Sequence, residues 1–295
     1  MMTTELGQSY QQCVRLARRH ARHFYHGFRL LPREKRLAVC AIYAFLRLGD
    51  DIADEQAGAG QAETAMRRWR DLLVAAYSGE VEAHPVLPAL RDVIIRYEIA
   101  RELFEHVLDG IAMDLSPISF ETFSELEHYC YLVAGVVGLL CLHVWGVTDW
   151  QTASDMAVAC GTAFQLTNIL RDIREDAMRG RVYLPEEDLA RYGVSREDLL
   201  NLENSAAIHA LILSEAERAE ALYRSCRRLA NFIMPDSRAA FLAMHGVYHA
   251  LLREICAQPE RVMERRIGLP AIVKLAIVTW SVVESRLMSS QWFHA

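Results

Sequence analysis

Apolar residues recur every three to four positions along nearly the whole chain, which is the spacing of helices that bury one face. Short runs of alternating polarity bounded by hairpin turns do not occur, and neither does an alternation of strands with helices. We therefore predict an all-α protein. The periodic segments place helices at residues 8–27, 33–55, 62–78, 86–111, 119–146, 151–178, 185–192, 204–233, 236–256 and 269–290.

Proline and glycine fall where these helices should begin or end. Pro32 and Pro117 precede helices, Pro185 opens one, and Gly180 follows one. Proline is tolerated in the first turn of a helix, and glycine is favoured just past its end. The 295 residues are 52% hydrophobic and contain no long linker, repeat or low-complexity segment. We predict a single domain over residues 1–295, with its helices packed around a central apolar space.

Two of the expected helices carry acidic residues on one face, although their preceding turns are apolar. At about 100° per residue, each set of polar residues falls within a sector of about 80°. Solvated helix faces do not usually continue from apolar turns in this way. The first stripe consists of Tyr43, Arg47, Asp50 and Asp54, and the second of Gln165, Asn168, Asp172 and Asp176.

Stacked carboxylates on buried helices are costly unless positive charge lies between them. Mg²⁺ prefers hard oxygen ligands and bridges to phosphate oxygens, so a magnesium–diphosphate cluster would satisfy two facing acidic walls. Single acidic pairs at this spacing, such as Glu98 and Glu102, are weaker evidence because they arise by chance. The repeated pattern predicts a metal site with Asp50 and Asp54 on one wall and Asn168, Asp172 and Asp176 on the other.

Composition narrows the function further. The formal net charge of −6 and the pI of about 6.0 disfavour a nucleic-acid-binding protein, which would usually be basic. Lys35 and Lys274 are the only lysines, so Schiff-base chemistry has few candidate nucleophiles. The seven cysteines are scattered and form no CxxC, as in reduced cytosolic proteins. The first residues contain no apolar signal-peptide core, and we expect a cytoplasmic protein.

Two segments bear on membrane contact. Residues 129–147 are long and apolar enough to span a bilayer, but acids flank them and no lysine or arginine lies close to either end. We predict a buried core helix there and no transmembrane anchor. Between Arg15 and Arg36 there are eight basic residues and one acid, Glu34. This stretch could be a solvated face, a cap that holds diphosphate, or a peripheral contact with the cytoplasmic membrane.

The two striped segments, YAFLRLGDDIAD from Tyr43 and QLTNILRDIREDAMRGRVYLP from Gln165, closely resemble the squalene/phytoene synthase family. The first matches the family's Y-x-x-x-R-x-x-D-x-x-x-D. The second matches N-x-x-x-D-x-x-x-D followed by G-R-x-Y-x-P. FRLLPREKR, which precedes the first motif, is also similar to the family. The resemblance extends from about residue 20 to residue 255.

The resemblance implies an all-α isoprenoid-synthase fold around a central apolar cavity. It implies Mg²⁺ binding by the five residues of the predicted metal site and places Tyr129 and Tyr183 near the reacting carbons. Arg181 corresponds to the arginine of the family's flap. Relatives carry small hydroxyl residues before the position of Phe24, a substrate-binding position, whereas this chain has Ala21 and His23. The diphosphate contacts that the resemblance implies come from His20, Tyr43, Arg47, Gln165, Arg171 and Tyr248.

For function, the resemblance implies head-to-head condensation of two allylic isoprenoid diphosphates by a prenyl transferase. FYHGFRLLPREKR and NILRDIREDAMRGRVYLPEEDL are most similar to bacterial squalene synthases. We therefore expect two farnesyl diphosphates to give squalene, or a squalene-like C30 product, through presqualene diphosphate. NADPH would serve a reductive second step. The chain has no GxGxxG after a strand, but the family binds its reductant without a Rossmann unit.

Three alternatives stay open. Two geranylgeranyl diphosphates would make the chain a phytoene synthase. DDIAD also matches the DDxxD motif of chain-elongating prenyltransferases, and Asn168, Asp172 and Asp176 approach the metal motif of terpene cyclases. Elongating enzymes generally bind the second diphosphate with lysines, and cyclases usually have Ser or Thr where Asp172 stands. The third alternative is a non-catalytic helical protein that binds membranes or lipids.

Overall fold

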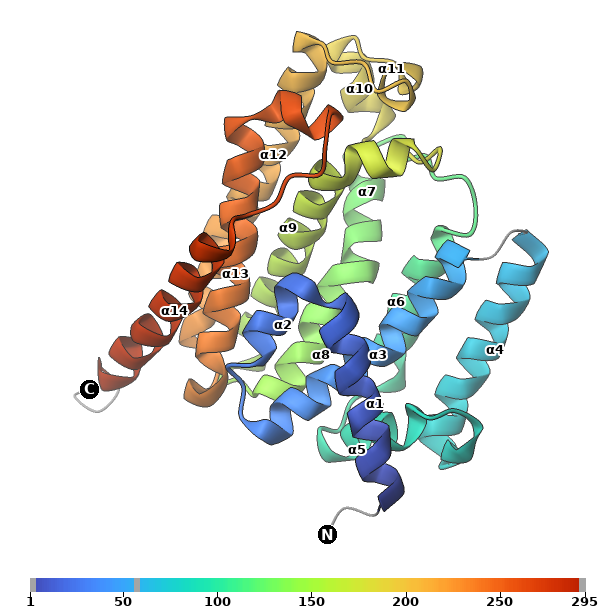
Figure 1. Ribbon diagram of the computed structural model, residues 1–295, viewed down its shortest axis with the longest axis vertical. Helices are drawn as coiled ribbons and strands as arrows, with labels where there is room; N and C mark the ends of the chain where they lie inside the picture. Colours follow the sequence, from blue (N-terminus) through green and yellow to red (C-terminus); the bar gives the residue numbers. More distant parts are fainter. Residues whose placement is uncertain (1–3, 56–58, 292–295) are drawn as a thin grey trace.

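The computed structural model describes residues 4–55 and 59–291, apart from the side chains of residues 22–23, 53–55, 59 and 290–291. In this part of the chain the secondary structure is helical, with one isolated β-bridge between Val147 and Ile233. The predicted all-α class is confirmed (Figure 1). The α-helices are α1 (Thr4–His20), α2 (Arg22–Phe28), α3 (Arg33–Glu55), α4 (Ala59–Ser78), α5 (Leu87–Arg96), α6 (Arg101–Met113), α7 (Phe123–Cys130), α8 (Val136–Trp145), α9 (Trp150–Ala177), α10 (Glu186–Tyr192), α11 (Arg196–Leu200), α12 (Ala206–Cys226), α13 (Pro235–Ala257) and α14 (Ala271–Gln291).

The long helix α9 is the central element of the bundle. It packs against α12 and α13 on one side and against α7 and α8 on the other, while α3 packs against α6 and α8 (Figure 1). Buried apolar side chains form two clusters, one mainly from α1, α3, α5, α6 and α8 and the other mainly from α7, α9, α12 and α13. Phe24 and Phe164 pack against both clusters, and the large cavity that they help to line lies between these two halves of the core.

The structure corrects two of the expected helices. Residues 8–27 do not form one helix, because the backbone leaves helical geometry at Ala21 (φ −76°, ψ 1°) and α2 begins at the next residue. Residues 86–111 also divide, because α5 ends at Arg96 and Glu98 has a φ of 49°, in the left-handed region. Neither break contains proline or glycine, so apolar periodicity gave no sign of them. The short helix α11 was not predicted either.

The predicted helix at 119–146 is continuous but locally unwound. Residues Tyr131–Gly135 form a π-helical turn between α7 and α8, a feature often found at functional sites. This turn packs backbone to backbone against α9. A Cβ atom on Gly161 would lie 2.3 Å from the carbonyl oxygen of Ala134, and one on Gly138 would lie 2.7 Å from that of Ala157. Only glycine permits these approaches.

By length and composition alone, Phe123–Trp145 could cross a membrane, a test that core helices of soluble proteins also pass. Half of its most apolar window is buried inside the protein. The segment packs against α6 on one side and α9 on the other. Its apolar character is therefore explained by helix packing and by the cavity that it helps to line.

Candidate active site

One cavity of about 1090 Å³ opens between the two halves of the core. Along both α3 and α9, the residues that line it change from apolar to polar toward the C-terminal end of the helix. On α3 the change runs from Val39 and Ile42 to Asp50, and on α9 from Ala157 to Asp176. Both helices run toward the upper part of the molecule in Figure 1. The cavity therefore has an apolar end for hydrocarbon and a polar end for charge.

The structure brings the two predicted stripes to the same cavity. The side chain of Asp54 lies outside the described residues, as does that of His23. Every other predicted metal ligand and diphosphate contact lines the cavity. These residues are His20, Phe24, Tyr43, Arg47, Asp50, Gln165, Asn168, Arg171, Asp172, Asp176 and Tyr248, together with Tyr183.

Asp172 is the most heavily paired carboxylate of the site. Arg266 donates to both of its oxygens, at 2.7 Å from Nε and 3.0 Å from Nη2. Arg171 also donates to both, at 2.7 Å from Nε and through Nη2. These two guanidinium groups outweigh the effect of burial and hold the pKa of Asp172 below its usual value. Asp172 is therefore ionised, with two arginines beside it that can turn to an anionic ligand.

On the opposite wall, Arg47 has a similar arrangement. Its Nη1 donates to Asp50 at 3.3 Å and its Nη2 donates to Asp51. Arg47 is half-buried, and these carboxylates raise its guanidinium pKa although burial opposes them. Each wall thus presents an arginine and carboxylates to one space. Such a surface can hold a metal-bound diphosphate by both its cations and its phosphate oxygens.

Asn168 carries an oxygen that needs a partner. Its Nδ2 donates to Gln165 Oε1 at 3.3 Å, while its Oδ1 is buried and accepts no hydrogen bond from the described residues. A buried acceptor without a donor is costly, and a metal ion would satisfy it. Among the described side chains, no three His, Cys, Asp or Glu groups lie close enough to hold a metal by themselves. The donor set fits Mg²⁺, which completes its shell with water and phosphate oxygens.

Asp176 lies in an unfavourable position for a negative charge. Burial, and secondarily repulsion from Asp172, raise its pKa from 3.8 to about 7, although Arg181 and Arg179 act in the opposite direction. A cation bound beside it would reverse this shift. The position of Asp176 thus favours a positively charged ligand, in agreement with the orphaned oxygen of Asn168, which lies about two turns earlier on α9.

Asp176 makes the metal-free protein less stable as the pH rises. Between about 3.8 and 7 the folded protein keeps a proton that the unfolded chain has released, so the contribution of Asp176 to folding is lost as pH increases across this window. Each pKa unit corresponds to about 1.4 kcal/mol. We expect Asp176→Asn to flatten this decline and to raise the unfolding free energy above pH 7 by a few kcal/mol. Denaturant unfolding at several pH values in a chelator tests this, with Asp109→Asn as the control; parallel curves for the Asp176 variant and the wild type would contradict it.

Three aromatic rings form a cluster in the cavity lining. The ring of Tyr248 packs against those of Phe24 and Phe164, with ring centroids 4.9 Å and 4.5 Å away, and the centroids of the two phenylalanine rings lie 6.2 Å apart. Burial raises the pKa of the Tyr248 hydroxyl, which keeps it neutral. All three rings line the cavity. Aromatic faces can stabilise a carbocation and exclude water from it.

Two residues that sequence reasoning placed at the reaction centre lie beside the cavity lining rather than in it. Tyr129 and Arg181 are not among the residues that line the large cavity. Tyr129 donates to Asp114 at 3.0 Å, and its ring lies 5.5 Å from that of Tyr183. Tyr183 donates to the same carboxylate at 2.9 Å, and Arg181 donates to the Asp114 carbonyl at 3.4 Å. Tyr129 therefore contacts the site through Asp114 and Tyr183, whereas Arg181 also lies close enough to Asp176 to lower the pKa of that carboxyl.

Sequence reasoning missed Asp114 and Arg266. Asp114 follows the apolar last turn of α6, so the signal that identified the two stripes, an acid at the end of an apolar helix, could have found it. Arg266 lies in the irregular segment before α14, where no periodicity applies. Its role depends on a contact across the fold with Asp172, and no local pattern could have shown it.

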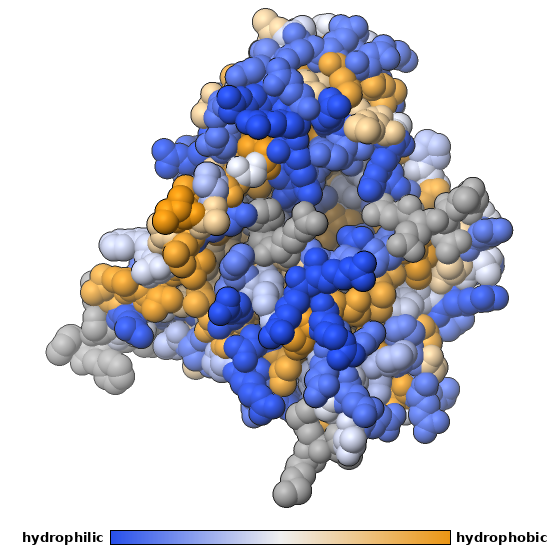
Figure 2. Space-filling view, in the orientation of Figure 1, coloured by the Kyte–Doolittle hydropathy of each residue, from blue (hydrophilic) through white to orange (hydrophobic). Residues whose placement is uncertain are grey.

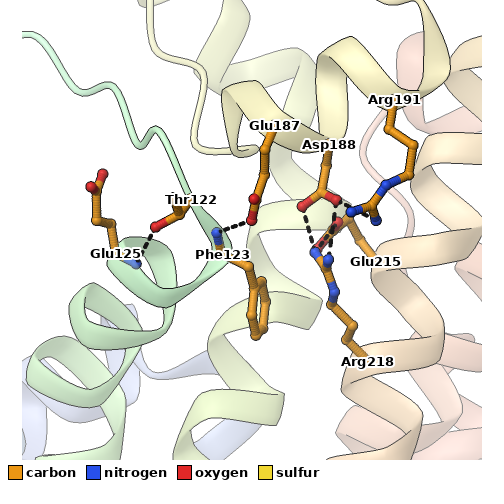
Figure 3. A network of polar contacts seen from close by, with 8 residues as sticks. All are labelled: Thr122, Phe123, Glu125, Glu187, Asp188, Arg191, Glu215 and Arg218. Carbon is orange, nitrogen blue, oxygen red and sulfur yellow. Dashed lines mark hydrogen bonds and ion pairs between the residues drawn. The ribbon is translucent and has the colours of Figure 1, made fainter.

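A buried ionic network fixes the segment that carries Tyr183 (Figure 3). Asp188, at the start of α10, is fully buried and accepts two hydrogen bonds from Arg218 of α12, at 2.6 Å and 3.1 Å. Glu215 accepts a third from the same guanidinium at 2.6 Å, and burial raises its pKa to about 7. Arg191 pairs with Asp188 at 2.9 Å from the solvent side.

The same guanidinium group also reaches α7. The Arg218 side chain lies over the ring of Phe123 at 4.2 Å, and the Phe123 backbone N–H donates to Glu187 at 2.7 Å (Figure 3). One arginine thus joins α7, α10 and α12. Since α10 follows directly after Tyr183, this network holds that tyrosine against the cavity.

Comparison with known proteins places nearly the whole chain in one family. Residues 17–272 match the family model described as squalene/phytoene synthase. The chain is 36% identical over 289 residues to a phytoene synthase from Mycobacterium tuberculosis, covering 96% of this chain and 93% of that protein. It is 32% identical over 295 residues to a phytoene synthase from Arthrospira platensis, covering 95% and 94%.

Solved structures of the same class are similar to it. A dehydrosqualene synthase bound to a ligand superposes with a TM-score of 0.87 at 30% identity, covering 97% of this chain and 98% of that one. A squalene synthase from Alicyclobacillus acidocaldarius gives 0.80 at 28% identity, covering 90% and 98%. The chain belongs to the squalene/phytoene synthase family, whose members are prenyltransferases, and it has their isoprenoid-synthase fold.

Proposed function

We propose that this chain catalyses the Mg²⁺-dependent head-to-head condensation of two farnesyl diphosphates, through presqualene diphosphate, to squalene or a squalene-like C30 product. One observation carries the proposal. Oxygen donors from α3 and α9 meet at the polar end of a single, mostly apolar cavity, where Asp50 faces the same space as Asn168, Asp172 and Asp176. The similarity in fold to a dehydrosqualene synthase supports the C15 substrate.

The charged residues bind the diphosphate groups and stabilise their departure. Asp50, Asn168, Asp172 and Asp176, with Asp54 from the sequence motif, would hold the metal ions. Bound Mg²⁺ supplies positive charge that neutralises the leaving diphosphate. Arg47, Arg171 and Arg266 lie beside these carboxylates and contact phosphate oxygens, and their stabilisation grows as negative charge develops on the leaving group.

The apolar residues govern the steps after ionisation. In the first step, the allylic cation from one substrate joins the double bond of the other chain and loses a proton. In the second step, the cyclopropyl diphosphate loses its diphosphate and rearranges, and the resulting cation accepts hydride from NADPH to give squalene or loses a proton to give a more unsaturated C30 product. The stacked rings of Phe24, Tyr248 and Phe164 exclude water from these cations. Tyr183, held by Asp114, presents a neutral hydroxyl at the cavity wall, because burial raises its pKa.

Product analysis tests the proposal. Purified protein is incubated with farnesyl or geranylgeranyl diphosphate and Mg²⁺, with and without NADPH. We expect presqualene diphosphate or a C30 hydrocarbon from farnesyl diphosphate, and a dependence on NADPH if the second step is reductive. The control omits the metal and adds chelator. A cyclised C15 product, or a linear product of ordinary chain elongation, would overturn the proposed reaction.

Phytoene synthesis from two geranylgeranyl diphosphates is the second candidate. It is favoured by the 36% identity, over nearly the full chain, to a protein named phytoene synthase. Both candidates use the same metal site and the same first step. They differ in the length of hydrocarbon that the apolar end accepts, and squalene formation also requires NADPH in the second step. A clear preference for the C20 substrate in the same assay would select this function.

A further inference from the structure

The C-terminal helix α14 has the opposite polarity to an ordinary surface helix, because it buries polar side chains and exposes apolar ones. Surface helices normally bury an apolar stripe and expose polar residues. In α14 the buried side contains Ser281 and Ser285, at 3% and 5% exposure. The exposed side carries Ile272, Leu275 and Trp280, at 72%, 62% and 61%. The packing of α14 against α13 therefore leaves most of its large apolar side chains in contact with solvent.

These exposed side chains lie on one side of the helix. At about 100° per residue, they fall within a sector of roughly 160° that extends over about four turns. Six of the twelve large apolar side chains that are exposed among the described residues belong to α14. A contiguous apolar surface of this kind marks an interaction site rather than chance exposure. We call it the α14 face, made of Ile272, Val273, Leu275, Trp280, Val283 and Leu287.

The α14 face carries almost no charge. Arg286 is exposed on it, while Glu284 lies to one side and pairs with Arg227 at 2.6 Å. Lys274 is directed to the catalytic cavity, whose lining it joins. Few charged side chains on this face could form ionic contacts with a soluble partner. The apolar core of a lipid layer, by contrast, could contact a nearly continuous apolar surface.

A cationic surface lies beside it. The exposed arginines of α1 and of the turn into α3 form no ion pair with any carboxylate in the described part of the chain. Helix α2, between them, packs on α13, as does α14. Figure 2 shows the hydrophilic surface of α1 and α2 and the apolar surface of α14 on the same side of the molecule. We call this group the arginine flank, made of Arg15, Arg18, Arg19, Arg29 and Arg33.

The catalytic cavity lies beside the arginine flank. Arg18 contributes to its lining from this flank and His26 contributes from α2, while Lys274 lines it from the side of α14 opposite the α14 face. A bilayer that bound the arginine flank would therefore lie close to residues that line the cavity. This proximity matters because prenyl diphosphates are amphipathic and their condensation product is an apolar hydrocarbon.

We propose that the α14 face and the arginine flank form one docking surface for an anionic lipid bilayer. The apolar side chains enter the headgroup boundary, with Trp280 at the level where tryptophan is enriched, and the arginines contact lipid phosphates. A second copy of the chain fits less well, because a dimer that buried the apolar α14 face would give the unpaired arginines of the flank no anionic partner. This inference concerns binding alone and does not depend on which prenyl diphosphate is the substrate.

Vesicle sedimentation tests the docking surface. The full chain is mixed with vesicles of phosphatidylcholine alone, or of equal parts phosphatidylcholine and phosphatidylglycerol. We expect binding to the anionic vesicles that weakens with added salt. Leu275→Ser/Leu287→Ser should weaken it by about tenfold or more, because two apolar side chains no longer enter the lipid. Arg15→Gln/Arg19→Gln should weaken it by about fivefold per charge removed.

The matched control is Ile95→Ser. Ile95 lies on α5, outside the residues of the α14 face and the arginine flank, and is 61% exposed, like Trp280. It should bind vesicles as the wild type does, and thermal melts should show that all variants are folded. The proposal is overturned if the wild type does not bind anionic vesicles, or if the double leucine variant binds them as strongly as the wild type does. A dimer that this variant dissociates, without vesicle binding by the wild type, would assign the α14 face to a second copy instead.

Discussion

Asp172→Asn should lower the rate of prenyl diphosphate turnover by about a thousandfold or more. The substitution keeps the shape of the side chain and removes the charge that two arginines share and that the proposed metal ion would bind. Loss of one electrostatic contact to a developing charge typically costs a hundred- to a thousandfold in rate, and loss of a metal ligand adds to this. Product formation from farnesyl and geranylgeranyl diphosphate at several Mg²⁺ concentrations gives the measurement.

Two further measurements separate this effect from simple unfolding. The Asp172 variant should require more Mg²⁺ for its residual activity, and its thermal unfolding should stay close to that of the wild type. Asp109→Asn is the matched control, because Asp109 also pairs with an arginine, Arg70 at 2.7 Å, but lies outside the cavity lining. Near-normal turnover by the Asp172 variant would exclude Asp172 as a metal ligand.

The largest loss of stability should come from Arg218→Met. Methionine keeps much of the side-chain volume over Phe123, but it leaves Asp188 and Glu215 buried without their shared guanidinium group. Removing one member of a buried ionic network typically costs about 3–5 kcal/mol, because the remaining charges stay desolvated. We expect a loss in this range, measured by denaturant unfolding at neutral pH.

Matched variants of the same network sharpen the test. Arg191→Met removes only the outer, solvent-facing partner of Asp188 and should cost less than about 1 kcal/mol. Adding Glu215→Gln to the Arg218 variant should restore part of the loss, since it removes the buried carboxyl group that has lost its arginine, whereas Asp188 keeps Arg191. If Arg218→Met and Arg191→Met were equally mild, the network would contribute little to the fold.

The helical class and the two acidic stripes could be predicted from the sequence because both depend on local periodicity. A side chain four positions along a helix returns to the same face whatever surrounds it, so the alignment of Asn168, Asp172 and Asp176 could be predicted without knowledge of the fold. The family resemblance added the expectation that the stripes share a cavity. The structure places the described members of both stripes in the lining of one cavity.

The features that the sequence could not predict depend on contacts between distant segments. The break at Glu98 has no proline or glycine to mark it, although its φ of 49° is in the left-handed region. Arg266 reaches Asp172 from an irregular segment, and Tyr129 reaches the site through Asp114. The sequence did not predict that α14 exposes its apolar side, because the pattern of a helix does not show which side packs against the rest of the protein. Tertiary packing decides each of these features.

The glycine contacts between α9 and the π-helical turn limit how the enzyme's chamber can be redesigned. Because Gly161 and Gly138 bring the main chain of α9 against that of the π-helical turn and of α8, any group added at these two positions would push the helices apart. An engineer who wants a roomier or tighter chamber must therefore change other positions. There Ile42, Leu46 and Phe241 project whole side chains into the lining and can be exchanged for smaller or larger ones.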